Sequence, residues 1–331
     1  MIKDLVALQD FLESHKIFYE QNIQLRDRTW IHRGGKVQFF ISPSNVQELR
    51  SVCHFVFENN LEYEIVGNTS NVYFLNEYNP RIVISTRKCN KVEYKENYIE
   101  CECGVNVMRL AKECISKGIC GFEYLSDLPG TVGAAIYNNS SCKENSVSKL
   151  LLEAELLTED GSVKILRYED FQYSFRSSIL KEKRLKGVIL NIKLNRKNGS
   201  KFLLEKIAKE NHEERLKILE GPANNLGCTF NSLFINGAMP IFYKLPLMLF
   251  KLILSLFRVK EQKQKEWSIK FILIISGNKK LIPYVSKKLV MTYVWRDNDA
   301  DKYFPQYVQF MRNVYKTDKL EIEIFDGNGK N

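Results

Sequence analysis

The stretch that decides the fold is residues 127–139, which read DLPGTVGAAIYNN. Gly130 and Gly133 permit backbone conformations and close approaches that a Cβ atom would block. Pro129 fixes the angle at which the chain enters the turn. Backbone N–H groups in such a turn can cradle a pyrophosphate. Taken alone, the stretch fits this interpretation and an ordinary turn before a buried element equally well.

Two upstream segments favour the phosphate-binding interpretation. Residues 67–71 read GNTSN and follow a strand-like run at 61–66, so they form a compact turn rich in hydrogen-bond donors. Residues 29–35 read TWIHRGG and precede the apolar run 37–41, which ends close to Pro43.

These three segments resemble the UDP-N-acetylenolpyruvoylglucosamine reductase (MurB) family. That family has N-T-(F/W)-x-x-G-G at the start of its flavin domain, then a loop G-x-G-S-N and a second loop G-I-P-G-T-V-G-G-A-x-x-x-N. This chain departs by Thr69 and Ala134 in place of glycines, and by Asp127-Leu128 in place of Gly-Ile. The resemblance implies that FAD is bound by Thr29, Gly34, Gly67, Asn68, Thr69, Ser70, Asn71, Pro129, Gly130, Thr131, Gly133, Ala134 and Asn139.

Three downstream motifs follow in the family's order. Residues 171–178, FQYSFRSS, resemble F-x-Y-R-x-S; residues 227–230, GCTF, resemble G-(S/C)-x-F; residues 320–324, LEIEI, resemble L-E-x-E-(V/I). The resemblance is good over 29–197 and patchy beyond. After Phe230 the family's Lys-Asn-Pro is replaced by Asn231-Ser232-Leu233.

The resemblance implies a reductase that converts the enolpyruvyl group of UDP-N-acetylglucosamine enolpyruvate to UDP-N-acetylmuramate for peptidoglycan synthesis, with NADPH reducing bound FAD. Arg176 would hold the substrate carboxylate through two parallel hydrogen bonds. Glu323 would stabilise the enolic intermediate. Cys228 would donate a proton, since a thiol with a pKa of about 8.5 is mostly protonated at neutral pH. Each also has a structural interpretation: a turn arginine, a polar strand edge and a buried cysteine.

Two alternative functions remain open at this point. A divergent flavoprotein oxidoreductase could act on another nucleotide sugar in surface-polysaccharide synthesis, beside a membrane. A flavin-binding protein without turnover could instead use the apolar run 245–257 to dock a partner or a membrane. The joint presence of Arg176, Cys228 and Glu323 argues against the second alternative, because a scaffold has no physical need for all three.

Composition narrows the class of protein. The chain has 331 residues, of which 44% are hydrophobic, so it can form two or three packed units. Its net charge of +10 favours acidic partners. The basic residues are scattered, which disfavours nucleic acid and leaves a UDP-sugar, FAD and NADPH. The oligomeric state and the choice between NADPH and NADH stay open.

Cysteine usage and the N-terminus point to a reducing compartment. None of the eight cysteines forms a paired C-x-x-C set and only four histidines occur, so no metal site is expected. The N-terminal residues lack the basic and apolar regions of a signal peptide. We therefore expect a cytoplasmic enzyme.

The predicted fold class is α+β. The resemblance implies an FAD-binding domain of the vanillyl-alcohol oxidase / p-cresol methylhydroxylase type at residues 1–200, with subdomains at about 15–88 and 89–200, and a smaller substrate domain at 201–331. Apolar periodicity predicts helices within 2–20, from 45, at 107–117 and at 205–220, the last as a solvated surface helix. Strands are predicted at 37–41, 61–66, 82–85 and 187–197, and hairpins at 92–104 and 150–167.

The C-terminal part has its own expectations. The apolar run 245–257 is too short to span a membrane, which needs about 20 residues. A buried helix is favoured; the alternative is an interfacial helix weakly associated with a membrane surface, with Lys244, Lys251 and Arg258 at its polar edge. Strands are expected at 271–275 and 289–294, and a helix at 299–315 leading into a strand at Leu320.

Overall fold

The structure, a computed structural model, describes residues 2–142, 145–221, 223–231 and 239–327. The chain forms two compact units. The first comprises Met1–Arg28, Gly34–Thr69 and Leu75–His212, and the second comprises Thr29–Arg33, Ser70–Phe74 and Glu213–Asn331. Two short N-terminal segments therefore belong to the unit that contains the C-terminal part of the chain. The predicted domain boundary at residue 200 stays a prediction.

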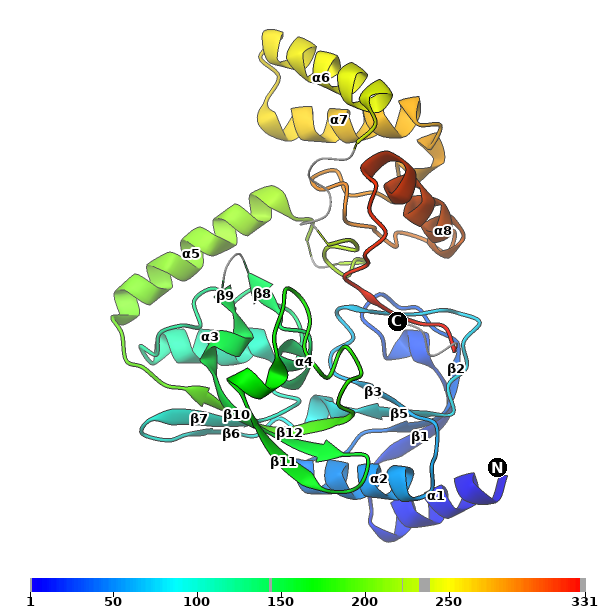
Figure 1. Cartoon of the computed structure of the whole chain (residues 1–331), viewed down its shortest axis with the longest axis vertical. Coiled ribbons are helices and arrows are strands. Elements are labelled where there is room, and N and C mark those ends of the chain that lie inside the picture. Colours follow the sequence, from blue (N-terminus) through cyan, green and yellow to red (C-terminus); the bar gives the residue numbers. More distant parts are fainter. Residues whose placement is uncertain (1, 143–144, 222, 232–238, 328–331) are drawn as a thin grey trace. The chain divides into compact units, whose positions relative to one another are not determined.

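The first unit contains a four-stranded sheet with the order β1-β2-β5-β3 (Figure 1). Its strands are β1 (Tyr19–Gln24), β2 (Lys36–Ile41), β3 (Glu64–Val66) and β5 (Ile82–Ser85). β5 runs parallel to β2 and β3, whereas β1 is antiparallel to β2. Helix α2 (Val46–Glu58) follows β2 and begins where the Asn45 side chain accepts a hydrogen bond from the Glu48 N–H. This confirms the predicted strand–helix–strand order. The N-terminal helix α1 (Ile2–Ser14) ends earlier than the 2–20 pattern suggested, because β1 starts at Tyr19.

A second sheet of the same unit is antiparallel, with the order β11-β10-β12-β7-β6. Its strands are β6 (Val92–Tyr94), β7 (Tyr98–Glu102), β10 (Leu151–Thr158), β11 (Val163–Arg167) and β12 (Gly187–Asn195). Both predicted hairpins are confirmed. The remaining helices and strands are α3 (Val107–Ser116), α4 (Val132–Tyr137), the two-residue strands β8 (Ser141–Cys142) and β9 (Asn145–Ser146), and α5 (Lys201–Ile218), whose residues after His212 belong to the second unit. One buried apolar cluster joins both sheets with α2 and α3. α5 is largely exposed, as predicted, with Leu204 and Asn211 buried.

The second unit is organised around aromatic side chains. β4 (Val72–Phe74) pairs in parallel with β13 (Glu323–Phe325). The Tyr293 ring lies 4.9 Å from the rings of both Trp295 and Tyr307. Helix α8 (Ala300–Phe310) continues into a π-helical turn, Met311–Tyr315.

Asp301 of α8 holds the two N-terminal segments of this unit. Its carboxylate accepts a 2.9 Å hydrogen bond from the Tyr73 hydroxyl and pairs with the Arg33 guanidinium at 2.8 Å. The pair is largely sheltered from solvent, which reduces screening of its charges. The segments 29–33 and 70–74 are therefore fixed to the same helix.

Helices α6 (Ile241–Leu256) and α7 (Glu261–Ile275) lie side by side in this unit (yellow to orange in Figure 1). The expectation that the apolar run is buried was wrong: Leu252 is 57% exposed and Leu256 is 73% exposed. No helix of the described residues combines the length and the apolar character that crossing a bilayer requires.

Two predicted strands were also wrong. Residues 271–275 form the end of α7, because this run of apolar residues continues a helix that starts at Glu261 and buries Ile272 and Leu273. Residues 289–294 make isolated bridges through Tyr293 and Val294 in place of a strand. Both stretches are short apolar runs, whose periodicity does not separate strand from helix.

A substitution at Gly104 provides a test of the packing in the first unit. A Cβ atom there would lie 1.8 Å from the Thr86 carbonyl oxygen and 2.6 Å from the Cys89 carbonyl oxygen. We expect Gly104→Ala to lower the free energy of unfolding by about 3 kcal/mol, because backbone must move to relieve the overlap. Gly221, whose added Cβ would meet nothing within 4 Å, provides the matched control. Urea unfolding should show Gly221→Ala within about 0.5 kcal/mol of the parent chain; equal effects of both variants would contradict this account.

Candidate functional site

The first predicted phosphate loop touches the second one at a glycine. β3 ends at Val66, and the chain turns at Gly67. A Cβ atom on Gly67 would lie 2.4 Å from Thr131 Oγ1 and 3.4 Å from Ala134 Cβ. Thr69 then adopts a left-handed φ of 52°, which turns the loop back. The structure therefore brings Gly67 together with Thr131 and Ala134, two predicted FAD residues 64 and 67 positions further along the chain.

The second loop is held in place by hydrogen bonds and close packing against Cys103 and Val105. Thr131 caps α4 by accepting the Ala134 N–H at 3.5 Å. The N–H groups of Val132 and Gly133 donate to the carbonyls of Val105 and Cys103, each at 2.8 Å. A Cβ on Gly133 would lie 2.8 Å from the Cβ of Cys103. Gly133 is thus required for close packing, and its amide is used inside the protein, contrary to the expectation that such amides are exposed to a phosphate.

The Thr29 segment forms a closed turn in the second unit. Thr29 Oγ1 donates to the Arg33 carbonyl at 2.7 Å and accepts the Arg33 N–H at 3.0 Å. His32 within this turn has a φ of 54°. Gly34 follows with a φ of 123°, which favours glycine, and donates its N–H to Asn76 Oδ1 at 3.0 Å. The turn is well defined, and the FAD contacts of Thr29 and Gly34 stay a prediction.

The end of the first loop is bonded to the predicted catalytic strand. Asn71 Nδ2 donates to the Glu321 carbonyl at 3.1 Å. The Asn71 carbonyl accepts the Glu323 N–H at 2.9 Å, and Glu323 lies opposite Val72 in the parallel pair β13–β4. Asn71, a predicted cofactor residue, is therefore hydrogen-bonded to the segment that carries Glu323, a predicted catalytic residue.

Cys228 directly precedes residues that pair with the segment 319–321, just before Glu323. Phe230 forms an antiparallel bridge with Leu320, and the Thr229 carbonyl accepts the Glu321 N–H at 2.9 Å. Cys228 directly precedes this bridged stretch, and Glu323 follows its partner by two residues. Cys228 and Glu323 are both half-buried. Ser232 and Leu233, where the sequence departs from the family pattern, lie outside the described residues.

Buried side chains pack around residues 228–230, and no sequence motif indicated them. Thr229 is fully buried, and its Oγ1 accepts the Tyr293 N–H at 3.1 Å. Tyr307 packs edge-on against Phe230 and donates its hydroxyl to the Val290 carbonyl at 2.9 Å. Burial raises the pKa of Tyr307 well above its ordinary value, so its hydroxyl stays protonated. The helical spacing of aromatic residues after 300 was the sequence signal for this core.

Arg176 is presented by a tight turn of the first unit. Ser174 and Ser177 exchange two backbone hydrogen bonds of 3.2 Å around it, and Arg176 itself has a φ of 57°. The guanidinium lies 5.6 Å from the centre of the Phe175 ring. The side chain is half-buried. A left-handed backbone at a non-glycine residue indicates a conformation that the surroundings enforce.

Asn139 connects this turn to the second loop. Its Nδ2 donates to the Ser174 carbonyl at 2.7 Å, and its Oδ1 accepts the Ser148 hydroxyl at 2.6 Å. Buried Ser178 donates to the Tyr137 carbonyl at 2.6 Å. The end of α4 thus positions Arg176. The catalytic candidates are distributed accordingly: Arg176 belongs to the first unit, and Cys228 and Glu323 belong to the second.

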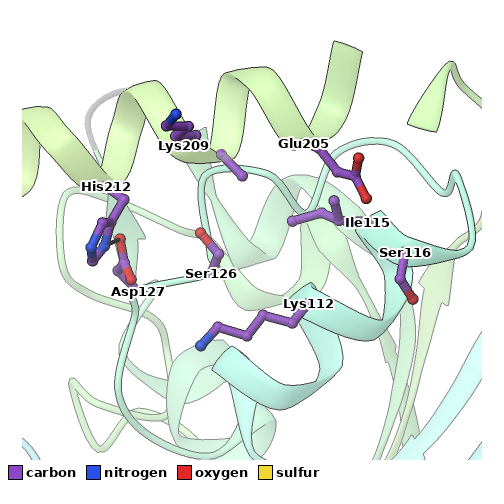
Figure 2. A pocket seen from close by; sticks show the side chains of 9 residues that line it. Lys112, Ile115, Ser116, Ser126, Asp127, Glu205, Lys209 and His212 are labelled. Carbon is purple, nitrogen blue, oxygen red and sulfur yellow. Dashed lines mark hydrogen bonds and ion pairs between the residues drawn. The ribbon is translucent and has the colours of Figure 1, made fainter. Parts of the chain in front are cut away.

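A hollow of about 410 Å³ lies between α3 and α5 of the first unit. Figure 2 shows His212 beside Asp127 at its margin, and His212 Nδ1 is 2.9 Å from Asp127 Oδ2. Asp127 opens the second phosphate loop, so this contact fastens α5 to that loop. The hollow itself is lined by Lys112 and Lys209 among others, and none of the predicted FAD residues is among those that line it.

Comparison with known proteins identifies the FAD-binding region and relatives. Residues 37–167 match the FAD binding domain family. UDP-N-acetylenolpyruvoylglucosamine reductase of Caldicellulosiruptor saccharolyticus is 33% identical over 174 residues, which cover 53% of this chain and 56% of the relative. The Streptococcus mutans enzyme of that name is 28% identical over 208 residues, covering 62% and 66%. That of Carboxydothermus hydrogenoformans is 32% identical over 215 residues, covering 64% and 70%. The chain thus spans between about half and two thirds of the length of the first two relatives.

A solved structure agrees on the fold. The reductase (MurB) from Thermus caldophilus superposes with a TM-score of 0.67 at 16% identity, over 94% of this chain and all of that one. The fold is α+β and contains an FAD-binding domain of the vanillyl-alcohol oxidase / p-cresol methylhydroxylase type, as predicted. From the motifs, the FAD-binding domain and a relative matched at 32% identity over 70% of its length, the chain belongs to the UDP-N-acetylenolpyruvoylglucosamine reductase family.

Proposed function

We propose that this chain is a cytoplasmic FAD-dependent reductase that uses NADPH to convert UDP-N-acetylglucosamine enolpyruvate to UDP-N-acetylmuramate for peptidoglycan precursor synthesis. The observation that carries the proposal is the contact of Gly67 with Thr131 and Ala134, which joins both predicted phosphate loops inside a matched FAD binding domain. The relatives' printed name supports the choice of reaction.

The residues present fit a flavin dinucleotide. The hydroxyls of Thr69 and Ser70 and the amide of Asn71 are suitable donors for phosphate oxygens. The glycine at 67 lets that loop lie against the 131–134 turn, where a larger residue would push the two apart. Bound FAD would supply hydride transfer from NADPH to the substrate. We propose residues 1–200 as the FAD-binding domain and residues 201–331 as the substrate domain.

The reaction places a demand on the protein's own side chains. Reduction of the vinyl carbon leaves an enolate next to a carboxylate, so negative charge accumulates on an anion. Arg176 meets this demand because a guanidinium stays charged and binds a carboxylate through two parallel hydrogen bonds. Its half-buried position strengthens the attraction relative to a fully solvated one.

Two further groups complete the proposed chemistry. Glu323 would share a proton with the enolic intermediate, and Cys228 would deliver a proton to the adjacent carbon. Both residues lie close in sequence to the bridge between Phe230 and Leu320, which supports their belonging to one part of the second unit. A protonated thiol suits a proton donor, whereas a nucleophile would need the thiolate.

Flavin spectroscopy on the purified chain tests the proposed reaction. We expect a bound flavin that NADPH bleaches and that UDP-N-acetylglucosamine enolpyruvate reoxidises. Bleaching without reoxidation would replace this substrate by another nucleotide sugar, an alternative that the changed sequence after Phe230 motivates. A bound flavin that neither NADPH nor NADH reduces would reject turnover altogether.

The role of Cys228 can be separated from general damage by measuring the two half-reactions. We expect Cys228→Ala to slow reoxidation by substrate by a factor of about 10² to 10⁴, the usual range for loss of a general acid, with reduction by NADPH nearly unchanged. Cys228→Ser should retain part of the rate because a hydroxyl can also donate a proton. Cys142→Ala, at another half-buried thiol, is the matched control. Equal slowing of both half-reactions would remove the assigned role.

The junction of the two loops can be tested by flavin retention. Gly67→Ala places a Cβ 2.4 Å from Thr131 Oγ1, so the loops must separate. We expect most of the flavin to be lost on gel filtration, with far-UV circular dichroism unchanged. Gly221→Ala should keep its flavin, because its Cβ would be in open space. Full flavin content in Gly67→Ala would show that the junction does not hold the cofactor.

A further inference from the structure

Helix α6 carries an apolar stripe along its outer face. Leu245, Met248, Leu252 and Leu256 recur at intervals of three and four residues and are 52–73% exposed. Such spacing places side chains on one face of a helix. Phe257, directly after the helix, is 78% exposed. Exposed apolar surface that is contiguous in this way marks an interaction site more often than scattered single residues do.

The opposite face of α6 is already occupied. Phe250 stacks on Phe271 of α7 with 4.3 Å between ring centres and 5° between the ring planes. Leu254 is 5% exposed. Since α7 fixes this side of the helix, the stripe faces solvent in the folded chain.

The helical pair and the residues that follow it carry a large share of the protein's net positive charge. Residues 241–281 contain nine lysines and arginines and two glutamates, a net charge of +7 out of +10 for the whole chain. The two glutamates pair with lysines of the same helix: Glu261 with Lys265 at 2.7 Å and Glu266 with Lys270 at 2.6 Å. The excess positive charge is therefore concentrated beside the apolar stripe.

Basic residues border the stripe on one edge. Lys244 and Lys251 are seven residues apart, close to two helical turns, and Arg258 follows directly after the C-cap of the helix. All three are exposed. Long basic side chains can lay their methylene groups along apolar surface while their charges reach a polar layer.

We propose that α6 and α7 bind the surface of an anionic lipid bilayer. α6 lies in the plane of the interface, with its leucine stripe at the acyl boundary and its basic edge at the headgroups. The charge excess favours anionic lipid headgroups, and the unbroken row of leucine and methionine favours a hydrocarbon layer over an acidic protein surface. This binding is separate from the reductase reaction and does not depend on it.

Flotation of the whole chain with vesicles tests the proposal. We expect the protein to float with vesicles of phosphatidylcholine and phosphatidylglycerol, and to stay at the bottom with phosphatidylcholine alone. Leu252→Gln with Leu256→Gln should weaken partitioning on the order of a hundredfold, since two inserted leucines are lost. Lys244→Glu, Lys251→Glu and Arg258→Glu together should weaken it at least on the order of tenfold.

Matched controls come from residues 201–212, the part of α5 that belongs to the first unit. Phe202→Gln with Leu203→Gln removes exposed apolar side chains of comparable exposure, 74% and 55%. Lys201→Glu, Lys206→Glu and Lys209→Glu reverse the same number of exposed charges. Both control variants should float like the parent chain. Circular dichroism and flavin content confirm that every variant folds.

A tryptophan placed at Phe257 reports on insertion depth. In Phe257→Trp, with Trp267→Phe to lower background, emission should shift to the blue on anionic vesicles and be quenched by brominated acyl chains. Absence of flotation by the parent chain would overturn the proposal. So would equal losses in control and test variants, or self-association in sedimentation that the leucine variant abolishes without any vesicle binding.

Discussion

The approach of Gly67 to Thr131 and Ala134 is the constraint on which the rest of the proposed site depends. At this point a turn after β3 lies against the first turn of α4, with no room for a side chain on the glycine. Two chain segments connect this contact to the turn of Arg176 and to the strand of Glu323. Along α4 the chain reaches Asn139, which holds the turn of Arg176. Along the first loop it reaches Asn71, which is bonded to the strand of Glu323. Each predicted phosphate loop is therefore continuous with a segment that holds a proposed catalytic residue.

Much of the first unit could be predicted from the sequence because its signals are local. The cap at Asn45, the alternation in 92–104 and the turn residues at 159–161 each specify an element from a few neighbouring residues. Local signals also indicated the two loops, although they did not reveal how Gly133 packs. Its amide and its missing Cβ both serve contact with Cys103, a neighbour 30 positions away that no turn pattern reveals.

The second unit was harder to predict because its order comes from distant partners. Its aromatic core gathers Tyr73 with residues beyond 290, and Asp301 joins Tyr73 to Arg33. The apolar runs at 245–257 and 271–275 have the composition of buried elements, so hydrophobicity alone suggested burial and a strand. Their actual arrangement depends on how the two helices pack. Phe250 of α6 stacks on Phe271 of α7, and the opposite face of α6 is exposed to solvent.

The pairing of β4 with β13 has a consequence for how the protein is made. Asn71 and Glu321, whose amide and carbonyl meet, are 250 positions apart. Closing so large a loop costs conformational entropy before any contact compensates for it. During synthesis the first unit can fold on the ribosome, whereas the second must wait until the last strand emerges. Throughout that interval β4 lacks the partner strand that β13 later provides, and its edge is open to pairing with other chains.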